Sequence, residues 1–396
     1  MSEIRKLRRE ELPESVTLSE FAFQYELSDA EREEQAGKMD PDQHWGFFEE
    51  GRLAAKLQLL NFHTWLNGRR FAMGGIAGVA TWPEYRRNGM VARLLGQTLK
   101  TMREQGQTLS FLAPFKFEFY RRYGWETYVD YMRYEIPADK LPKFEAPAGG
   151  TVRRIASDWE RLNPLYVEYA KRYNGMLERD EDWWTKRHFK SKKGTVAVYA
   201  NAQGEPRGYV HYQVKERTAT IHELVFLDEE ARRGLWKFIA DHDSMIAKIV
   251  VKAPSDDQLP FLLHDPTIKQ EKLAYFMARI VDAESFLAQY AYAPRPDAEP
   301  LHLRITDPHA EWNQGIFRLQ FGGGGTSAQA ARLSGLEAPD EEGLLSCSIQ
   351  TLAALFLGYQ TPGFMAGIGR LQGSPELVAR LEAALPRRTT FLLDFF

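Results

Sequence analysis

The segment VATWPEYRRNGMVARLL, residues 79–95, contains residue types that are suited to binding a phosphorylated ligand. Arg86 and Arg87 offer directional donors that can neutralise a diphosphate. Gly89 permits a backbone conformation closed to most other residues and lets a ligand approach closely. A helix that starts here adds unpaired backbone N–H groups and the positive end of its dipole. We therefore predict a phosphorylated cofactor at this loop, against the alternative of a surface turn with solvated arginines.

A hairpin and an amphipathic helix must position this loop. Asn67-Gly68 is the pair that best tolerates the positive φ angles of a tight hairpin, so residues 53–81 predict two strands. Residues 108–115 and the run WETYVDYMRYEI predict two further strands, with a short helical or irregular piece between them. The helix after the loop has one apolar face, formed by Val91, Leu94, Leu95, Leu99 and Met102.

The composition describes an ordinary globular chain with room for two or three domains, since 396 residues are 44% hydrophobic and 27% charged. A net charge of -3 gives no electrostatic reason to bind nucleic acid or an anionic membrane, so we predict neither partner.

The single cysteine, Cys347, rules out an intrachain disulfide. We expect a cytoplasmic protein, because no stretch reads as a signal peptide or a membrane span. The histidines show no metal-ligand spacing, so we predict no metal.

Two proline-rich stretches, at 137–150 and 293–300, divide the chain into thirds that could each bury a core. We expect domains at 1–138, 150–292 and 297–396. Residues 219–243 can be laid without gaps over residues 74–98, which sets Gly234 against Gly89. The overlay indicates a duplicated module whose second copy has lost its loop chemistry, and chance similarity is the competing interpretation.

The pattern V-A-T-x-P-x-x-R-R-x-G-x-x-x-x-L resembles the acetyl-CoA signature of the GNAT superfamily of N-acetyltransferases. The resemblance implies acetyl-CoA as co-substrate, with its pantetheine arm paired to residues 79–81 and its pyrophosphate held by residues 86–92. It also implies that Phe115 lies near the thioester, where related enzymes often carry small or acidic residues. The cofactor-binding residues implied in this way are Val79, Ala80, Thr81, Arg86, Arg87, Asn88, Gly89, Met90, Val91, Ala92 and Phe115.

The last third resembles the sterol-carrier-like domain of the enhanced intracellular survival (Eis) acetyltransferases, in residues 302–321, 345–371 and the closing TTFLLDFF. Those proteins combine an active acetyltransferase domain, a degenerate second copy and this cap. The implied fold class is α+β, with two tandem GNAT-type mixed-sheet domains and a C-terminal sterol-carrier-protein-like domain. Members are often hexamers, so the resemblance implies a homo-oligomer.

The same resemblance implies that the terminal carboxylate of Phe396 is the general base and that Tyr120 protonates the departing CoA thiolate. Residues 391–396 alternate as a strand would, which could fix the chain end. An α-carboxylate has an ordinary pKa of roughly 3.3 to 3.7, so it needs burial or a relaying water to act as a base near neutral pH. The alternatives are a final strand that only completes a sheet, and a tyrosine that is only part of the core; Tyr123 is the obvious confusion with Tyr120.

The implied reaction is direct acetyl transfer, without an acyl-enzyme, to a small cationic amine such as an aminoglycoside-like molecule, a polyamine or a lysine side chain. Residues 19–35 occupy the place of the substrate lid and combine aromatic with acidic residues, which suits either a polycation site or an ordinary charged helix. Asp394 could add negative charge near the base. Two rival functions are a lipid- or sterol-binding carrier and a catalytically silent GNAT scaffold.

Overall fold

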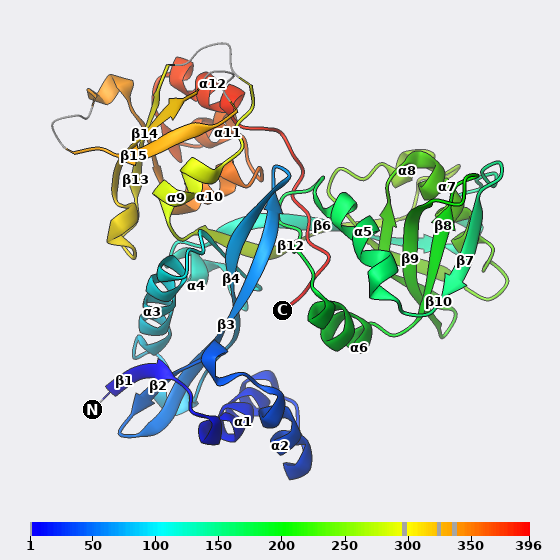
Figure 1. Cartoon of the computed structure of the whole chain (residues 1–396), viewed down its shortest axis with the longest axis horizontal. Coiled ribbons are helices and arrows are strands. Elements are labelled where there is room, and N and C mark those ends of the chain that lie inside the picture. Colours follow the sequence, from blue (N-terminus) through cyan, green and yellow to red (C-terminus); the bar gives the residue numbers. More distant parts are fainter. Residues whose placement is uncertain (1, 295–298, 323–325, 335–338) are drawn as a thin grey trace.

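The computed structural model describes residues 2–294, 299–322, 326–334 and 339–396 (Figure 1). Within these ranges one sheet of twelve strands runs through both predicted acetyltransferase domains. In spatial order its strands are β1 (Ser2–Lys6), β2 (His44–Glu49), β3 (Arg52–Leu66), β4 (Arg69–Thr81), β5 (Leu109–Leu112), β12 (Lys269–Ile280), β6 (Glu126–Pro137), β11 (Lys248–Ala253), β10 (Thr218–Phe226), β9 (Pro206–Lys215), β8 (Thr195–Ala200) and β7 (Thr151–Ile155).

Helices connect these strands and pack against the sheet. They are α1 (Leu12–Phe23), α2 (Asp29–Lys38), α3 (Met90–Glu104), α4 (Phe117–Arg121), α5 (Trp159–Ala170), α6 (Phe189–Ser191), α7 (Glu229–Ala240) and α8 (Leu259–Leu262). A π-helix lies at Trp183–His188, and short 3-10 helices lie at Arg9–Glu11, Pro41–Gln43, Pro83–Tyr85 and Ala138–Lys140. In the described part of the chain, every helix is too short or too polar to cross a lipid bilayer.

The predicted hairpin and the helix after the loop are confirmed. Asn67 and Gly68 have φ angles of 51° and 76° and join β3 to β4. On α3 the predicted apolar face is buried at Leu94, Leu95 and Leu99, which pack on the sheet. Both features depend on residues close in sequence, which explains why the sequence predicts them.

The predicted duplication is visible in the order of elements. β1 to β4, α3, β5, α4 and β6 in the first repeat are matched by β7 to β10, α7, β11, α8 and β12 in the second. In each repeat the strand before the helix pairs in parallel with the strand after it, β4 with β5 and β10 with β11. Both repeats therefore have the same local topology.

The two repeats exchange their last strands. β12 of the second repeat lies between β5 and β6, and β6 of the first repeat lies between β12 and β11. One hydrophobic core also joins residues of all three thirds, among them Phe71, Phe276 and Leu352. The thirds therefore share a core, in addition to smaller clusters such as that of Leu7, Leu12 and Val16 in the first repeat. We keep 1–138, 150–292 and 297–396 as proposed sequence units; position 297 lies outside the described residues.

The strand-to-helix connections of the two repeats differ in length, so the gapless overlay is wrong beyond the strand. In the first repeat β4 ends at Thr81 and α3 begins only after the loop 82–89. In the second repeat α7 begins at Glu229, shortly after β10 ends at Phe226. Gly234 therefore lies inside α7, whereas Gly89 caps α3.

The C-terminal domain has its own sheet, in which five strands are described. In spatial order these are β15 (Ala328–Arg332), β14 (Gly315–Phe321), β13 (Leu301–Thr306), β16 (Leu345–Ser348) and β17 (Leu371–Gln372). Its helices are α10 (Ile349–Phe356), α11 (Pro362–Gly367) and α12 (Pro375–Ala384), with 3-10 turns at Glu311–Asn313 and Glu341–Gly343. Helix α9 (Ala283–Gln289) belongs to the proposed unit 150–292 but packs on β14 and β15 of this sheet. The glycine run at 322–325, whose composition favours a turn, falls largely outside the described residues, because 323–325 are not described.

The chain end leaves this domain and runs back across the large sheet toward β3 (Figure 1). The predicted strand at 391–396 is wrong, because these residues have no strand assignment. The N–H of Phe391 donates to the carbonyl of Asn174 at 3.0 Å, and beyond it side chains fix the tail. Phe391 and Leu393 point into the core of the second repeat, and Leu392 points into the shared core.

Candidate active site

β4 and β5 separate after a short paired stretch. They pair only from Met73 to Ile76, because β5 ends at Leu112 while β4 continues to Thr81. Among the described strands none pairs with this edge of β4 beyond Ile76. Its free backbone groups, at Val79, Ala80 and Thr81, therefore suit an extended ligand that pairs like a strand.

The loop before α3 presents unused donors. Gly89 has a φ angle of 69° and caps α3 without a side-chain hydrogen bond, so the first N–H groups of the helix, at Met90, Val91 and Ala92, remain free. Arg86, Arg87 and Asn88 are exposed, and neither arginine has an ion-pair partner within the described residues. Free donors and positive charge at a helix start fit a diphosphate.

The second repeat lacks these features at the matching place. The carboxylate of Asp228 accepts a hydrogen bond from the N–H of Ala231 at 2.8 Å and so caps α7 itself. Glu229 and Glu230 add two more negative charges in the first turn. A phosphate would meet a capped helix start and like charge, so this copy is unsuited to bind the cofactor in the same way.

Replacing Arg87 by alanine should weaken acetyl-CoA binding. We expect the KM for acetyl-CoA to rise by about tenfold, since a charge-assisted hydrogen bond contributes roughly 1.5 kcal/mol or more. Steady-state kinetics with varied acetyl-CoA measure this change. Arg233→Ala, at an exposed arginine of α7, is the matched control and should leave the KM unchanged. An Arg87→Ala enzyme with the original KM would place the diphosphate elsewhere.

Tyr120 lies on α4 in the core beneath α3. Tyr120 is only 2% exposed, and it shares this core with Ile76 and Leu112 of the two separating strands. Burial raises the pKa of the phenol, so it stays protonated at neutral pH. The ring of Phe115 lies 5.2 Å from that of Tyr120 and is 67% exposed, which places it at the surface side of the phenol. Tyr123 instead packs on His309 at 5.1 Å.

The last residue, Phe396, packs on the opposite face of the sheet. Its ring lies 4.9 Å from Phe62 and 5.0 Å from Phe276, and the residue is 9% exposed. Gly75 of β4 makes room for it, because an added Cβ there would lie 2.8 Å from the Phe396 ring. Successive strand residues face opposite sides, so Ile76 lies on the side of Tyr120 and Gly75 on the side of Phe396.

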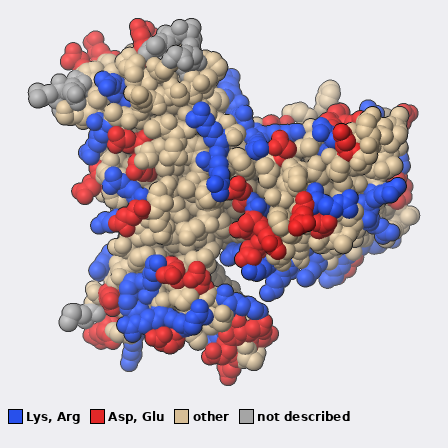
Figure 2. All heavy atoms as spheres, viewed as in Figure 1, with Lys and Arg blue, Asp and Glu red and all other residues tan. Residues whose placement is uncertain are grey.

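A cavity of about 1210 Å³ lies on the Phe396 side of the sheet, between the first repeat and residues 178–187 of the second. Phe62 and Trp183 line it, and it reaches Gly78, the residue that precedes the free edge of β4. In Figure 2 a hollow separates the α1–α2 part from the second repeat, and acidic side chains gather beside it. Its acidic lining consists of Asp40, Glu178, Asp180, Glu181 and Asp182.

The expected lid contributes little to this cavity. Of residues 19–35, only Ser19 and Gln35 line it, whereas Phe21 and Phe23 are exposed elsewhere. The acidic run within LERDEDWW (177–184) supplies most of the negative lining, and sequence reasoning missed it. Its charge density was the available signal, but charged runs usually lie on solvated surfaces.

Sequence reasoning also missed two buried basic residues in the cavity wall. Lys56 donates to the carbonyl and hydroxyl of Ser15 and to the hydroxyl of Ser19, and burial lowers its pKa to about 7. His44 lines the same wall, and burial lowers its pKa to about 4. Near neutral pH this wall therefore carries less positive charge than its residue types indicate.

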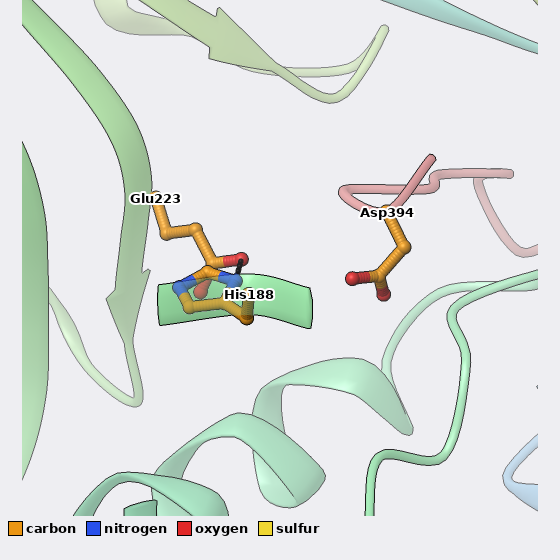
Figure 3. Close-up of side chains that lie close together, drawn as sticks. All are labelled: His188, Glu223 and Asp394. Carbon is orange, nitrogen blue, oxygen red and sulfur yellow. Dashed lines mark ion pairs between the residues drawn. The ribbon is translucent and has the colours of Figure 1, made fainter. Parts of the chain in front are cut away.

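His188, Glu223 and Asp394 form a buried cluster whose ligand-type atoms lie within 4.8 Å of one another (Figure 3). A metal ion fits this cluster poorly, because Arg179 contacts both carboxylates, at 2.5 Å for Glu223 and 2.8 Å for Asp394. Asp394 could add negative charge near the base, but the same arginine is paired with its carboxylate. Its carboxylate is buried and paired.

Buried histidines should make the fold sensitive to acid. His188 and His211 lie with ring nitrogens 3.1 Å apart, and burial lowers their pKa values to about 2 and about 4. An unfolded histidine takes up a proton near pH 6.5, so the free energy of unfolding should fall as pH drops from 7 to 5, by roughly 2 kcal/mol per histidine. Urea unfolding at the two pH values measures it. His188→Gln/His211→Gln should show a smaller decrease, and an equal decrease would contradict this assignment.

Comparison with known proteins identifies the parts of the chain. Sequence profiles of acetyltransferase (GNAT) domains match residues 3–128 and 175–280, and a sterol carrier protein domain profile matches residues 283–393. An uncharacterized N-acetyltransferase of Streptomyces avermitilis is 26% identical over 394 residues, which cover 91% of this chain and 90% of that protein. N-acetyltransferase Eis of Mycobacterium tuberculosis is 25% identical over 340 residues, which cover 80% of each.

Solved structures agree over the whole chain. A crystal structure from Enterococcus faecalis, described as a probable N-acyltransferase, is 28% identical with a TM-score of 0.91 and full coverage of both chains. Eis1 from Mycobacterium abscessus shares the fold, with a TM-score of 0.81 at 21% identity and full coverage.

The two acetyltransferase profiles, together with the split β4 edge, define the class: the chain is a GNAT N-acetyltransferase. Such enzymes use acetyl-CoA, and the free donors before α3 fit that molecule. Its tandem GNAT domains, its sterol carrier protein domain and its relation to Eis make it an Eis-like N-acetyltransferase. The predicted family and α+β fold class are confirmed.

Proposed function

We propose that the first GNAT domain moves an acetyl group from acetyl-CoA directly to a primary amine held in the 1210 Å³ cavity. The observation that carries this proposal is the position of Gly78, which both lines the cavity and precedes the free edge of β4. An amine in the cavity would therefore lie next to a ligand paired along Val79, Ala80 and Thr81. The proposal includes the catalytic and cofactor-binding residues that the sequence predicts.

In the proposed mechanism the two proton-transfer groups act from opposite sides of the sheet. Bound acetyl-CoA supplies the activated acetyl thioester. The carboxylate of Phe396 takes a proton from the ammonium group on the cavity side, and Tyr120 gives a proton to the CoA sulfur on the α3 side. The separation of β4 from β5 opens the sheet between these two groups.

A covalent acyl-enzyme has little support from the described residues. Cys347 is buried in the C-terminal domain, and burial raises its pKa to about 12, so its nucleophilic thiolate is scarce. The amine itself is therefore the proposed nucleophile, and the Phe396 carboxylate is the group that removes its proton.

We propose a small cationic amine as the acceptor. Some acidic side chains of the cavity are already paired, such as Glu178 with Arg70 at 2.6 Å and Asp182 with Lys186 at 2.7 Å. Asp180 and Glu181 have no ion-pair partner in the part of the chain that the structure describes, so they remain available for an ammonium group. A molecule with two or three amines matches this limited free charge better than a long polycation.

A thiol-release assay with the untagged chain tests the proposal. Acetyl-CoA is combined with a diamine, spermidine, an aminoglycoside or a lysine peptide, and mass spectrometry locates the added acetyl group. We expect turnover on a primary amine of at least one acceptor. If no amine is acetylated, the alternatives are a lipid carrier, which binds a fluorescent fatty acid, or a silent scaffold, which binds only CoA. The proposal includes a homo-oligomer, a hexamer by the resemblance, and sedimentation of the same sample tests it.

A further inference from the structure

Side chains of the second repeat hold Asp394, the fourth residue of the tail segment FLLDFF (391–396). One carboxylate oxygen of Asp394 accepts from the Nε of Arg179 and the hydroxyl of Tyr166, both at 3.2 Å. The other accepts from the indole of Trp183 at 2.9 Å and lies 2.8 Å from the Nη2 of Arg179. Arg179 therefore contacts this carboxylate with two nitrogens, the geometry that gives an arginine–carboxylate pair its directional strength.

Arg179 is itself fixed from the other side. Its guanidinium donates to both oxygens of Glu223, at 2.5 Å and 3.1 Å, and lies 3.9 Å from the ring centre of Tyr166. Burial is the largest effect on Glu223 and opposes its ionisation, but the interactions with Arg179, His188 and Lys192 together outweigh it and hold the pKa of that carboxyl well below its usual range. Lys192 lies 3.3 Å from Glu223, so two cations balance two carboxylates here.

The backbone of Asp394 is held as well. Its carbonyl accepts from the hydroxyl of Tyr275, on β12, at 2.9 Å. Phe395 then points outward, with 66% of its surface exposed, and Phe396 turns back against Phe62 and Phe276. Two residues span at most about 7 Å, so an anchor at Asp394 limits where the terminal carboxylate can lie.

We propose that Arg179, acting through Asp394, is a positioning residue for the terminal carboxylate of Phe396. The inference rests on the proposed function, because it needs that carboxylate to be the base. It also gives the second repeat a role in the reaction, since this repeat lacks the cofactor loop but supplies the arginine that holds the catalytic end of the chain. Residues 391–396 need no strand-to-strand hydrogen bonds, because the ion pair between Arg179 and Asp394 fixes them instead.

The test compares Asp394→Asn in two backgrounds, the full chain and the chain lacking Phe396. Asp394→Asn keeps the size of the side chain but removes its charge. We expect it to lower kcat by roughly 10- to 100-fold in the full chain, because misplacing a catalytic group by about 1 Å has effects of that size. The KM for acetyl-CoA should change by less than about twofold. In the chain lacking Phe396, Asp394→Asn should leave the residual rate unchanged, because no terminal group remains at the base position.

Asp130→Asn is the matched control. Asp130 is a buried aspartate that accepts from the hydroxyl of Tyr359 at 3.1 Å and pairs with Lys272 at 3.2 Å. A variant that only disturbs the structure should change kcat by the same factor in the full chain and in the chain lacking Phe396. We expect this result for Asp130→Asn. Arg179→Gln tests the partner side of the pair and should behave as Asp394→Asn does. If Asp394→Asn does not fold, Tyr275→Phe, which frees the carbonyl of Asp394, replaces it in the same comparison.

The outcomes separate the two proposals. If loss of Phe396 leaves kcat unchanged, both proposals are overturned: the terminal carboxylate is not the base, and Arg179 has no base to position. If loss of Phe396 lowers kcat but Asp394→Asn has no effect, or has the same effect in both backgrounds, only the positioning role is overturned. A reduced kcat that depends on the presence of Phe396 supports both.

Discussion

Deletion of Phe396 is expected to lower kcat for acetyl transfer by about 10²- to 10⁴-fold, the usual contribution of a general base. The deletion removes the ring that packs on Phe276 and on Phe62, a residue of the cavity wall, and it moves the terminal carboxylate back by one residue. The KM for acetyl-CoA should stay within about twofold, because the cofactor loop at 86–92 lies on a different part of the first repeat. Steady-state kinetics on untagged enzyme measure both constants.

Two controls separate the carboxylate from the ring. Phe396→Leu keeps a terminal carboxylate on an apolar residue and should retain most of the activity. One glycine added after Phe396 keeps the ring but moves the carboxylate by about 3.5 Å, so it should behave like the deletion. Full activity in the extended chain would show that the terminal carboxylate has no part in the reaction.

Tyr120→Phe is expected to cause the second large loss, about 10²- to 10⁴-fold in kcat, because the departing thiolate loses its proton donor. The exchange removes only one oxygen from a residue that is 2% exposed, so the core around α4 should remain intact. Burial raises the pKa of this phenol, so the wild-type donor stays protonated over the whole accessible pH range.

Tyr123→Phe is the control for that prediction. Tyr123 lies one turn further along and packs on His309 instead of on Phe115, so its hydroxyl should be dispensable. A large loss in Tyr123→Phe together with an active Tyr120→Phe would exchange the roles of the two tyrosines. Rapid-quench kinetics of a single turnover check that the lost step is acetyl transfer and not product release.

The sequence predicted the features that depend on neighbouring residues. Asn67-Gly68 fixes its hairpin through two positive φ angles, and the apolar stripe of α3 requires only helical spacing. The loop from Arg86 to Gly89 has the exposure and free donors that its residue types indicate. For these elements short-range conformational preference and tertiary packing agree.

Features that depend on contacts between distant parts of the chain could not be predicted. The exchange of β6 and β12 brings together strands far apart in sequence, and hydrophobic patterns do not specify which neighbour a strand takes. The pairing of Asp394 could not be predicted, because its partner, Arg179, lies far away in sequence, in the second repeat. The acidic residues of 178–182 could not be assigned to a cavity from the sequence, because only the fold places this segment opposite β3.

The chain end shows why pattern alone is insufficient there. Residues 391–396 alternate as a strand does, but no neighbouring strand among the described residues offers them a ladder of hydrogen bonds. Side chains fix this segment instead. Phe391 and Leu393 pack in the core of the second repeat, and Asp394 forms an ion pair with Arg179. An extended segment fixed in this way can end wherever its last anchor places it.

A crystal structure with CoA and a bound amine tests the central claim most directly. The account predicts the diphosphate at Arg86 and Arg87, the pantetheine arm along residues 79–81, and the amine within hydrogen-bond distance, about 3 Å, of a terminal oxygen of Phe396. CoA bound to the second repeat, or a Phe396 carboxylate that points into solvent with the amine bound elsewhere, would contradict it.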